Sequence, residues 1–306
     1  MLAIARLLRL SLAPTVAADV VVGILLGHAG RWPDGKAPWL LVGASLLIYH
    51  GAMALNDWAD REEDARTRPG RPIPSGAVSP GTARGAGWIL PALGVALAGS
   101  ISWQLAVGYS LLTACALTYD LRGRGPLRGP LLLGLCRGGN LALGMALVWV
   151  EDDPGASIAP LLGVLAPILY AAFIVCVSFL GRLEDGQGGS LQHRPARYVR
   201  GAAAALCSTP ALGLLMTPPP TKWAWTACTG LSVASGLWLL NAIPKGDWTP
   251  ALVRQAMGRA LRSTLPFTAS LALLHSGDSI VARWVVLGVL AAVPLSHALR
   301  RVLPPS

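Results

Sequence analysis

The chain contains 306 residues, of which 53% are hydrophobic and only 13% charged, and it carries a formal net charge of +10. Soluble domains contain about 25% charged residues, and their apolar residues recur in short periodic groups. The composition therefore excludes an ordinary soluble domain, and it also excludes a disordered chain, which would be rich in charge and poor in Leu, Ala and Val. It indicates a membrane protein.

Ten apolar segments of the chain are long enough to cross a bilayer. The hydrocarbon core is about 30 Å thick and an α-helix rises about 1.5 Å per residue, so a crossing takes roughly 20 residues. The segments do not alternate in ten-residue units, as the strands of a transmembrane barrel would. In chain order the predicted spans are Leu8–Ala29, Trp39–Asn56, Gly85–Ser102, Gln104–Tyr119, Gly129–Val150, Ile158–Gly181, Arg197–Thr217, Trp223–Ile243, Ala251–His275 and Ile280–Leu299.

This pattern predicts an all-α fold, a polytopic membrane helical bundle of about nine to ten transmembrane helices. The linkers between the spans are short, so residues 1–306 are expected to form a single domain.

The basic residues are distributed unevenly about the predicted spans. With the N-terminus placed in the cytoplasm, most of them fall on the cytoplasmic side, and only Arg31, Lys36, Lys222 and Arg283 face the other side. This positive-inside asymmetry places cations beside anionic lipid headgroups. Topology and membrane lipid thus account for the +10 charge, and we predict no nucleic-acid partner. We expect an integral membrane protein, with a bacterial inner membrane as its default location.

The most informative stretch follows the second span on the cytoplasmic side. Asp57, Asp60 and Asp64 are spaced i, i+3 and i+7, so on one continuous helix they would share a face. Carboxylates this close repel one another, whereas a hard cation stabilises them, because Mg²⁺ takes one or two carboxylates and completes its shell with water and substrate phosphate. The alternative interpretation is a solvated helix end, since Glu62 and Glu63 are also acidic.

A basic loop containing Arg66, Arg68 and Arg71 follows these acids directly. Guanidinium groups beside carboxylates suit a metal–diphosphate site, in which the cation bridges the phosphates and the arginines bind the free oxygens. The acids also run against the basic bias of this side of the membrane. We therefore predict a metal–diphosphate site here.

The stretch NDWADREEDARTRPGRPIPSG, residues 56–76, resembles the first aspartate-rich motif of the UbiA superfamily of intramembrane prenyltransferases, NDxxDxxxD followed by a basic loop and RPxPSG. Span order and loop positions extend the resemblance along most of the chain. It implies helices arranged around a central cavity, where Mg²⁺ holds an isoprenyl diphosphate whose tail is buried among the helices. Ionisation then gives an allylic cation that an acceptor captures.

Carried onto this sequence, the resemblance assigns site residues in the first half of the chain. Asn56, Asp57, Asp60 and Asp64 would form the metal and diphosphate set, and the three arginines of the basic loop would assist in diphosphate binding. The family commonly has nine spans, so the segment 280–306 is expected to form an additional C-terminal helix, for which packing and topology suffice as a role.

The loop after the fourth span departs from the family pattern of Tyr-x-x-x-Lys. The loop has Tyr119 but no lysine after it, and Arg122 and Arg124 are equal candidates to bind phosphate in place of the lysine. Arginine and lysine both bind phosphate, although they are not interchangeable in geometry. The alternative role for these arginines is that of a positive-inside anchor.

The segment after the sixth span departs further from the family's second aspartate-rich motif. Glu184 and Asp185 remain as candidate ligands, with Glu184 assigned to the metal, whereas Gly181 and Ile174 stand where further aspartates are expected. Arg182 among them would bind phosphate. The departure is compatible with a single Mg²⁺, a rearranged site or a different reaction.

Several polar residues fall inside predicted spans, where a charged group costs a few kcal/mol at the bilayer centre and normally faces a cavity. Arg137 and Asn140 lie i, i+3 on the fifth span, and Arg137 is interpreted as a diphosphate ligand or as the partner of Asp19 in a structural ion pair. His50 lies two turns before the first aspartate, either lining the cavity as a base or in a helix–helix hydrogen bond. The predicted cavity-lining residues are Asp19, His50, Tyr119, Asn140 and Ser178.

Our leading hypothesis is an Mg²⁺-dependent prenyltransferase that moves the prenyl group of an isoprenyl diphosphate to a small-molecule acceptor. A membrane terpene cyclase, in which double bonds of the prenyl chain capture the cation, is the alternative within enzymes. A non-catalytic transporter is a minor alternative from another class, since a transporter has no reason to retain a diphosphate–metal loop.

Overall fold

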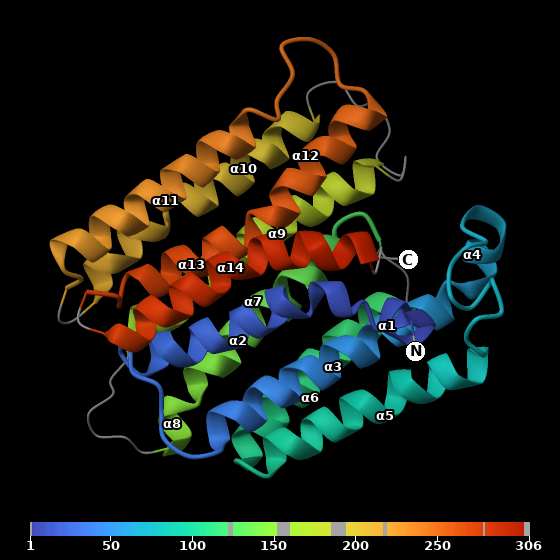
Figure 1. Cartoon of the computed structure of the whole chain (residues 1–306), viewed down its shortest axis with the longest axis horizontal. Helices are drawn as coiled ribbons and strands as arrows, with labels where there is room; N and C mark the ends of the chain where they lie inside the picture. The colour runs from blue at the N-terminus through green and yellow to red at the C-terminus, as the bar shows by residue number, and fades with distance from the viewer. Residues whose placement is uncertain are drawn as a thin grey trace.

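The structure is a computed structural model that describes residues 2–121, 125–151, 160–184, 194–216, 219–277 and 279–302. The described part is a bundle of helices without a strand (Figure 1), which confirms the predicted all-α class. The elements are α1 (Leu2–Leu7), η1 (Leu10–Leu12), α2 (Ala13–Gly27), α3 (Ala37–Ala59), α4 (Arg61–Thr67), α5 (Pro80–Gly99), α6 (Trp103–Leu121), α7 (Arg128–Ala146), α8 (Val148–Glu151), α9 (Pro160–Glu184), α10 (Arg194–Cys207), η2 (Thr209–Leu215), α11 (Lys222–Leu240), α12 (Pro250–Arg262), α13 (Thr264–Leu273) and α14 (Ile280–Val302).

Five stretches of helix within the described residues are long and apolar enough to cross a membrane. The protein is thus an integral membrane protein, as the composition predicted. These stretches are Leu10–Gly27, Ala37–Ala59, Arg128–Val150, Pro160–Leu183 and Ile280–Leu299.

Two predicted spans are interrupted where the sequence weakens a continuous helix. The predicted span Arg197–Thr217 divides into α10 and η2 around Ser208, and Ala251–His275 divides into α12 and α13 at Ser263. Pro210 and Pro266 follow these breaks by two and three residues. Since proline has no N–H, it removes an intrahelical hydrogen bond to the preceding turn.

The helices pack in two groups that are joined where α7 contacts α9. In one group α3 lies against α5, α6 and α2, and α2 packs along α7. In the other, α10 packs between α9 and α11, α12 contacts α9, α13 contacts α11, and α14 packs on α13 and α2. Figure 1 shows α1, α4 and the C-terminal end of α14 at the same end of the bundle. That end gathers the chain start and the acidic segment.

Glycines allow α2 and α7 to approach each other closely. A Cβ atom added to Gly23 would lie 2.3 Å from the carbonyl oxygen of Leu141, and one added to Gly144 would lie 2.5 Å from that of Val20. Small residues at membrane helix contacts permit such close packing, which replaces the hydrophobic driving force that is missing in lipid. The contact fixes α2 against α7, the two helices that carry the polar groups described below.

We expect Gly23→Ala to destabilise the protein by about 1–3 kcal/mol, because the added methyl forces the two backbones apart. Thermal unfolding in detergent measures the effect. The matched control is Gly230→Ala on α11, where an added Cβ meets nothing within 4 Å. Equal melting temperatures for the two variants would contradict close packing at Gly23.

Candidate functional site

The acidic segment bends at its middle aspartate. α3 ends at Ala59, α4 begins at Arg61, and Asp60 lies between them with φ −83° and ψ 0°. The premise of one continuous helix under Asp57 and Asp64 is therefore wrong. Both carboxylates are nevertheless buried, with 2% of each residue exposed.

An arginine of the basic loop brings the two buried aspartates together. Arg71 Nη1 donates to Asp64 Oδ2 at 2.5 Å and lies 3.6 Å from Asp57 Oδ1. The loop that carries Arg71 is held in place because Ile73 and Val78 pack in an apolar cluster with Leu7 of α1. The sequence predicted these residues together, and the structure adds that the arginine lies between the acids.

A second arginine of this cluster, Arg9, was not among the predicted site residues. Its Nη2 donates to Asp57 Oδ1 at 3.0 Å and lies 3.5 Å from Asn56 Oδ1. Arg9 adopts φ 50° and ψ 47°, a left-handed conformation that is uncommon for a residue with a side chain. The charge pattern placed Arg9 and the acids on one side of the membrane, but no spacing rule connects residues 47 or 48 positions apart.

The cluster continues through Asn56 to another residue outside the predicted set. Asn56 Nδ2 donates to Asp120 Oδ1 at 2.9 Å, near the end of α6. Both residues are buried. Asp120 also lines a pocket, so the carboxylate marks the point where the charged cluster meets an apolar space.

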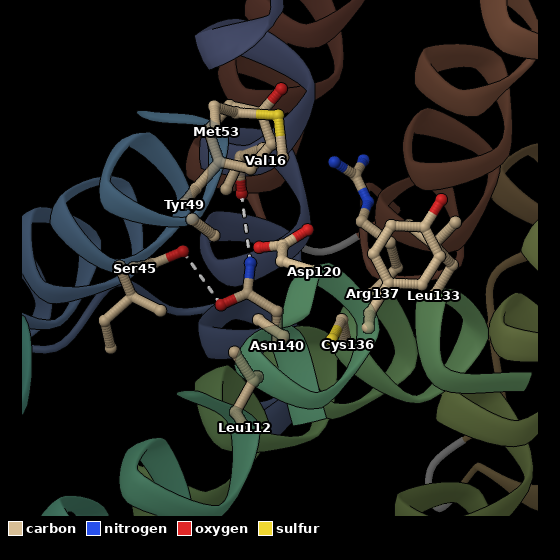
Figure 2. A pocket seen from close by; sticks show the side chains of 14 residues that line it. Val16, Ser45, Tyr49, Met53, Leu112, Asp120, Leu133, Cys136, Arg137 and Asn140 are labelled. Atoms are coloured by element: carbon tan, nitrogen blue, oxygen red, sulfur yellow. Dashed lines mark hydrogen bonds between the residues drawn. The ribbon is translucent and has the colours of Figure 1, made fainter. Parts of the chain in front are cut away.

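The pocket lies between α2, α3, α6 and α7, and its empty space, counted out to its open mouth, is about 640 Å³. Figure 2 shows Met53 at one side of it and Leu112 at the other, with Asp120 and Asn140 drawn between them. Apolar side chains line most of its wall. The lining residues are Val16, Ser45, Ile48, Tyr49, Ala52, Met53, Leu112, Ala116, Tyr119, Asp120, Leu133, Cys136, Arg137 and Asn140.

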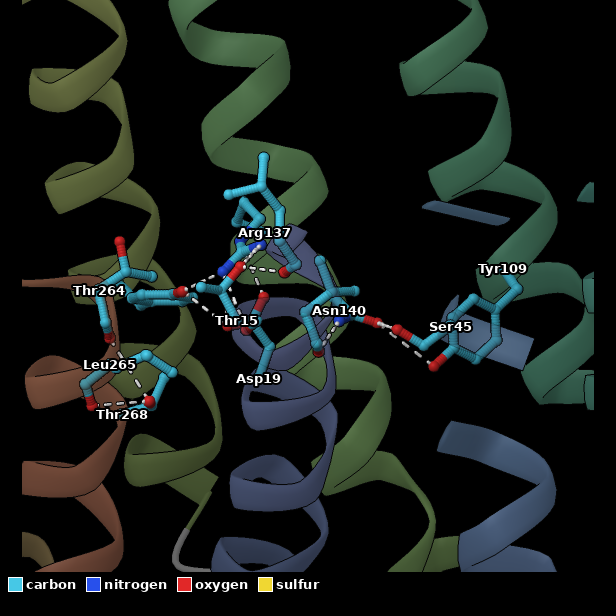
Figure 3. A network of polar contacts seen from close by, with 12 residues as sticks. Thr15, Asp19, Ser45, Tyr109, Arg137, Asn140, Thr264, Leu265 and Thr268 are labelled. Carbon is cyan, nitrogen blue, oxygen red and sulfur yellow. Dashed lines mark hydrogen bonds and ion pairs between the residues drawn. The ribbon is translucent and has the colours of Figure 1, made fainter. Parts of the chain in front are cut away.

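One charged side chain of the pocket wall, Arg137, is neutralised from α2 and α9. Arg137 Nε lies 2.8 Å from Asp19 Oδ2, and its Nη2 donates to the Tyr170 hydroxyl at 2.9 Å. The Tyr170 hydroxyl in turn donates to Asp19 Oδ1 at 2.6 Å, and Arg137 also donates to both oxygens of Thr15 (Figure 3). Of the two roles considered for Arg137, the structure displays the ion pair with Asp19.

The predicted cavity-lining residues are divided by the structure. Tyr119 and Asn140 line the pocket, with Arg137 between α2 and α9. His50 Nδ1 is 2.6 Å from the Leu8 carbonyl oxygen, so it joins α3 to the chain start rather than facing this pocket. Ser178 is half-buried on α9, away from the lining residues.

The other predicted phosphate ligands lie outside the cluster. Arg66 is exposed and bonds back to the Glu62 carbonyl, and Arg68 is exposed at the end of α4. Arg182 Nη1 donates to the Gly125 carbonyl at 2.5 Å. Arg122, Arg124 and Asp185 lie outside the described residues, and of Glu184 only the backbone position at the end of α9 is described.

The donor set of the cluster suits a hard cation. Within the described residues, no three His, Cys, Asp or Glu side chains form a metal group. Two carboxylates are nevertheless held within reach of one guanidinium, and Mg²⁺ commonly uses one or two carboxylates together with substrate phosphate. The Nε atoms of Arg9 and Arg71, both described, are buried without a hydrogen-bond partner, which leaves donors for phosphate oxygens at the same place.

We expect Arg71→Leu to destabilise the protein by about 3 kcal/mol, because it leaves the buried Asp64 carboxylate without its ion-pair partner. The melting temperature in Mg²⁺-free detergent buffer measures the loss. Arg66→Leu on the exposed face of α4 is the control, with an expected effect within about 0.5 kcal/mol. Similar melting temperatures for both variants would contradict the role of Arg71 as the stabilising ion-pair partner of the buried aspartates.

We expect Arg137→Met to lower the free energy of unfolding by about 3–5 kcal/mol, because Asp19 is then a buried charge without its partner. Removing both charges in Asp19→Leu/Arg137→Met should restore much of the stability. A double-mutant cycle on thermal unfolding yields the coupling energy. Additive effects of the two substitutions would show that the pair is not coupled.

Comparison with known proteins agrees with this arrangement. The sequence profile of the UbiA prenyltransferase family matches residues 12–254. A digeranylgeranylglyceryl phosphate synthase of Methanopyrus kandleri is 32% identical over 214 residues, which cover 67% of this chain and 73% of the relative. The bacteriochlorophyll synthase 33 kDa chain of Cereibacter sphaeroides is 32% identical over 160 residues, 49% of this chain and 47% of that protein.

Solved structures share the fold. A UbiA homologue from Aeropyrum pernix superposes with a TM-score of 0.62 at 21% identity, covering 84% of this chain and 96% of its own. A UbiA homologue from Archaeoglobus fulgidus, solved with GPP and Mg²⁺, gives a TM-score of 0.61 at 15% identity and covers 95% and 99% of the two chains. The resemblance inferred from the aspartate-rich motif is confirmed: this chain belongs to the UbiA prenyltransferase family.

Proposed function

We propose that this protein binds an isoprenyl diphosphate inside the membrane and transfers the prenyl group to a small-molecule acceptor. One observation carries the proposal. An apolar pocket ends at Asp120, which accepts a hydrogen bond from Asn56 of the arginine–aspartate cluster. A prenyl diphosphate has the same division, with an apolar chain joined to a highly charged head.

The charged cluster suits the diphosphate end. Arg9 and Arg71 each keep a buried Nε donor, and guanidinium groups bind phosphate oxygens in geometries that a single N–H cannot match. Asn56, Asp57, Asp60 and Asp64 are the residues that would hold Mg²⁺. When bound, the ion supplies positive charge against the departing diphosphate. The family membership and the GPP- and Mg²⁺-bound homologue support these assignments.

The pocket suits the prenyl end. Its wall is mostly apolar. Of its two charged residues, Arg137 is paired with Asp19, and Asp120 accepts a hydrogen bond from Asn56 at the end that meets the charged cluster. Such a wall excludes water, which would otherwise capture the allylic cation, and it leaves the acceptor or the chain's own double bonds as partners. Transfer to an acceptor agrees with the family of prenyltransferases to which the chain belongs, and product analysis distinguishes it from cyclisation.

We further propose the membrane arrangement that the charge pattern predicts. The whole chain would form one domain of nine to ten membrane helices, with α14 as the additional C-terminal helix. The acidic segment and the chain start, which lie at one end of the bundle in Figure 1, would face the cytoplasm across a bacterial inner membrane.

The test is incubation of purified protein with geranyl, farnesyl and geranylgeranyl diphosphates and MgCl₂, with and without membrane lipid extract as the source of acceptor. We expect pyrophosphate release that depends on the extract, together with prenylated lipid products. Asp57→Asn should reduce the rate by at least about 100-fold, since it removes a buried charge of the head-group site. Glu62→Gln, at an exposed position of α4, is the control and should retain the wild-type rate.

Two results would contradict the proposal. Cyclic hydrocarbons or terpene alcohols formed without the extract would show a terpene cyclase. Wild-type turnover by folded Asp57→Asn protein would remove this cluster from the reaction.

A further inference from the structure

We propose that the pocket has a fixed floor formed by Ser45, Tyr109, Leu112 and Asn140, which limits the bound prenyl chain to two or three isoprene units. This inference rests on the proposed function, because it takes the pocket as the place of the prenyl chain. It adds the substrate's length, which the aspartate-rich motif does not encode.

The pocket runs lengthwise along two helices. On α3 its lining extends from Met53 to Ser45, and on α6 from Asp120 to Leu112. Each stretch advances eight residues, so the pocket is about 12 Å deep at a rise of about 1.5 Å per residue. Figure 2 shows Leu112 and Asn140 away from Met53. Asp120 marks the opposite end of the α6 lining from Leu112, and its hydrogen bond from Asn56 joins that end to the charged cluster.

The deep end is closed by a hydrogen-bonded group of side chains from three helices. Ser45 Oγ donates to Asn140 Oδ1 at 2.8 Å, and the Tyr109 hydroxyl lies 3.5 Å from the same oxygen (Figure 3). Asn140 Nδ2 donates to the Val16 carbonyl at 3.3 Å. Because every partner is buried and mutually bonded, these side chains cannot swing aside without leaving polar atoms unpaired.

Beyond this group the helices are filled by apolar side chains. These side chains form a buried hydrophobic cluster, and Tyr109 belongs to it and is fully buried. Interiors of this kind pack as densely as organic crystals, so a longer chain would have to displace whole side chains. The other buried members of the cluster are Val20, Ile24, Leu41, Ala44, Ala98, Leu105 and Leu147, together with Ile48, which also lines the pocket.

The depth translates into a number of isoprene units. An extended chain advances roughly 1.2 Å per backbone bond, and each isoprene unit has four such bonds, or about 5 Å. A pocket of about 12 Å therefore takes two to three units, the length of a geranyl or farnesyl chain. A geranylgeranyl chain, at about 20 Å, would leave about 8 Å of its length, or between one and two units, outside the pocket.

The test measures binding alone and needs no acceptor. Wild-type protein in detergent with MgCl₂ is titrated with the non-hydrolysable S-thiolodiphosphates of dimethylallyl, geranyl, farnesyl and geranylgeranyl chains. We expect the affinity to rise at least about tenfold for each unit that enters the pocket, because each unit buries five carbons. The affinity should then level off between farnesyl and geranylgeranyl.

Substitutions that shorten the floor side chains should deepen the pocket and raise the affinity for longer chains. Leu112→Ala and Tyr109→Ala are each expected to raise the affinity for the geranylgeranyl analogue about tenfold relative to the farnesyl analogue, compared with wild type. The matched control is Leu111→Ala, because Leu111 neighbours Leu112 on α6 but is 64% exposed. Ratios between variants cancel the partitioning of longer chains into detergent, and Leu112→Ala suffices if Tyr109→Ala does not fold.

The outcomes separate the two levels of inference. If no analogue binds the wild-type protein, the proposed function fails and the floor with it. If the analogues bind but the affinity keeps rising to geranylgeranyl, or if Leu112→Ala and Leu111→Ala give the same profile, the floor is refuted while the proposed function stands.

Discussion

The structure depends on the requirement that a charge buried in a membrane helix bundle be paired. Isolated charges there are costly, and breaking a buried pair leaves an uncompensated ion. The protein meets this requirement twice, with Arg71 and Arg9 against Asp57 and Asp64, and with Arg137 against Asp19. The Arg9–Asp57 and Arg137–Asp19 pairs join residues 48 and 118 positions apart, and Arg71 holds the basic loop on the nearby aspartates. The two clusters therefore tie the chain start, α2, α3, α7 and the basic loop into one arrangement.

The two clusters differ in what remains available to a ligand. At Arg137 the partners include a carboxylate, a tyrosine hydroxyl and two threonine oxygens, so the charge is offset within the protein. The Nε atoms of Arg9, Arg71 and Arg137 are all buried without a hydrogen bond, but that of Arg137 lies 2.8 Å from Asp19 Oδ2, whereas Arg9 and Arg71 form their ion pairs through Nη atoms. The first cluster therefore offsets the charge of Arg137 in the pocket wall, whereas the second can bind further anionic oxygens. This division matches an apolar chain and a charged head.

The sequence predicted the parts of this arrangement that are encoded locally. The membrane class follows from composition, and Asp57, Asp64 and Arg71 lie within one short motif, so their proximity was foreseeable. Arg9 and Asp120 were not predicted, because their contacts with residues 56 and 57 depend on how α1, α3 and α6 pack. The breaks at Ser208 and Ser263 were missed for a different reason, since hydropathy averages over a segment and does not register where proline interrupts its hydrogen bonds.

The paired state of the acidic cluster also bears on how it would act. A site that stabilises a departing diphosphate is most effective when its dipoles and charges are already oriented, because little reorganisation then accompanies the reaction. Arg71 forms ion pairs with both Asp57 and Asp64 and so fixes their carboxylates relative to each other, and Arg9 forms a second ion pair with Asp57. Binding of a cation by the carboxylates and of phosphate oxygens by the arginines would exchange ion-pair partners without uncovering any charge. The strained backbone of Arg9 is consistent with this, since a left-handed residue persists only where its contacts hold it.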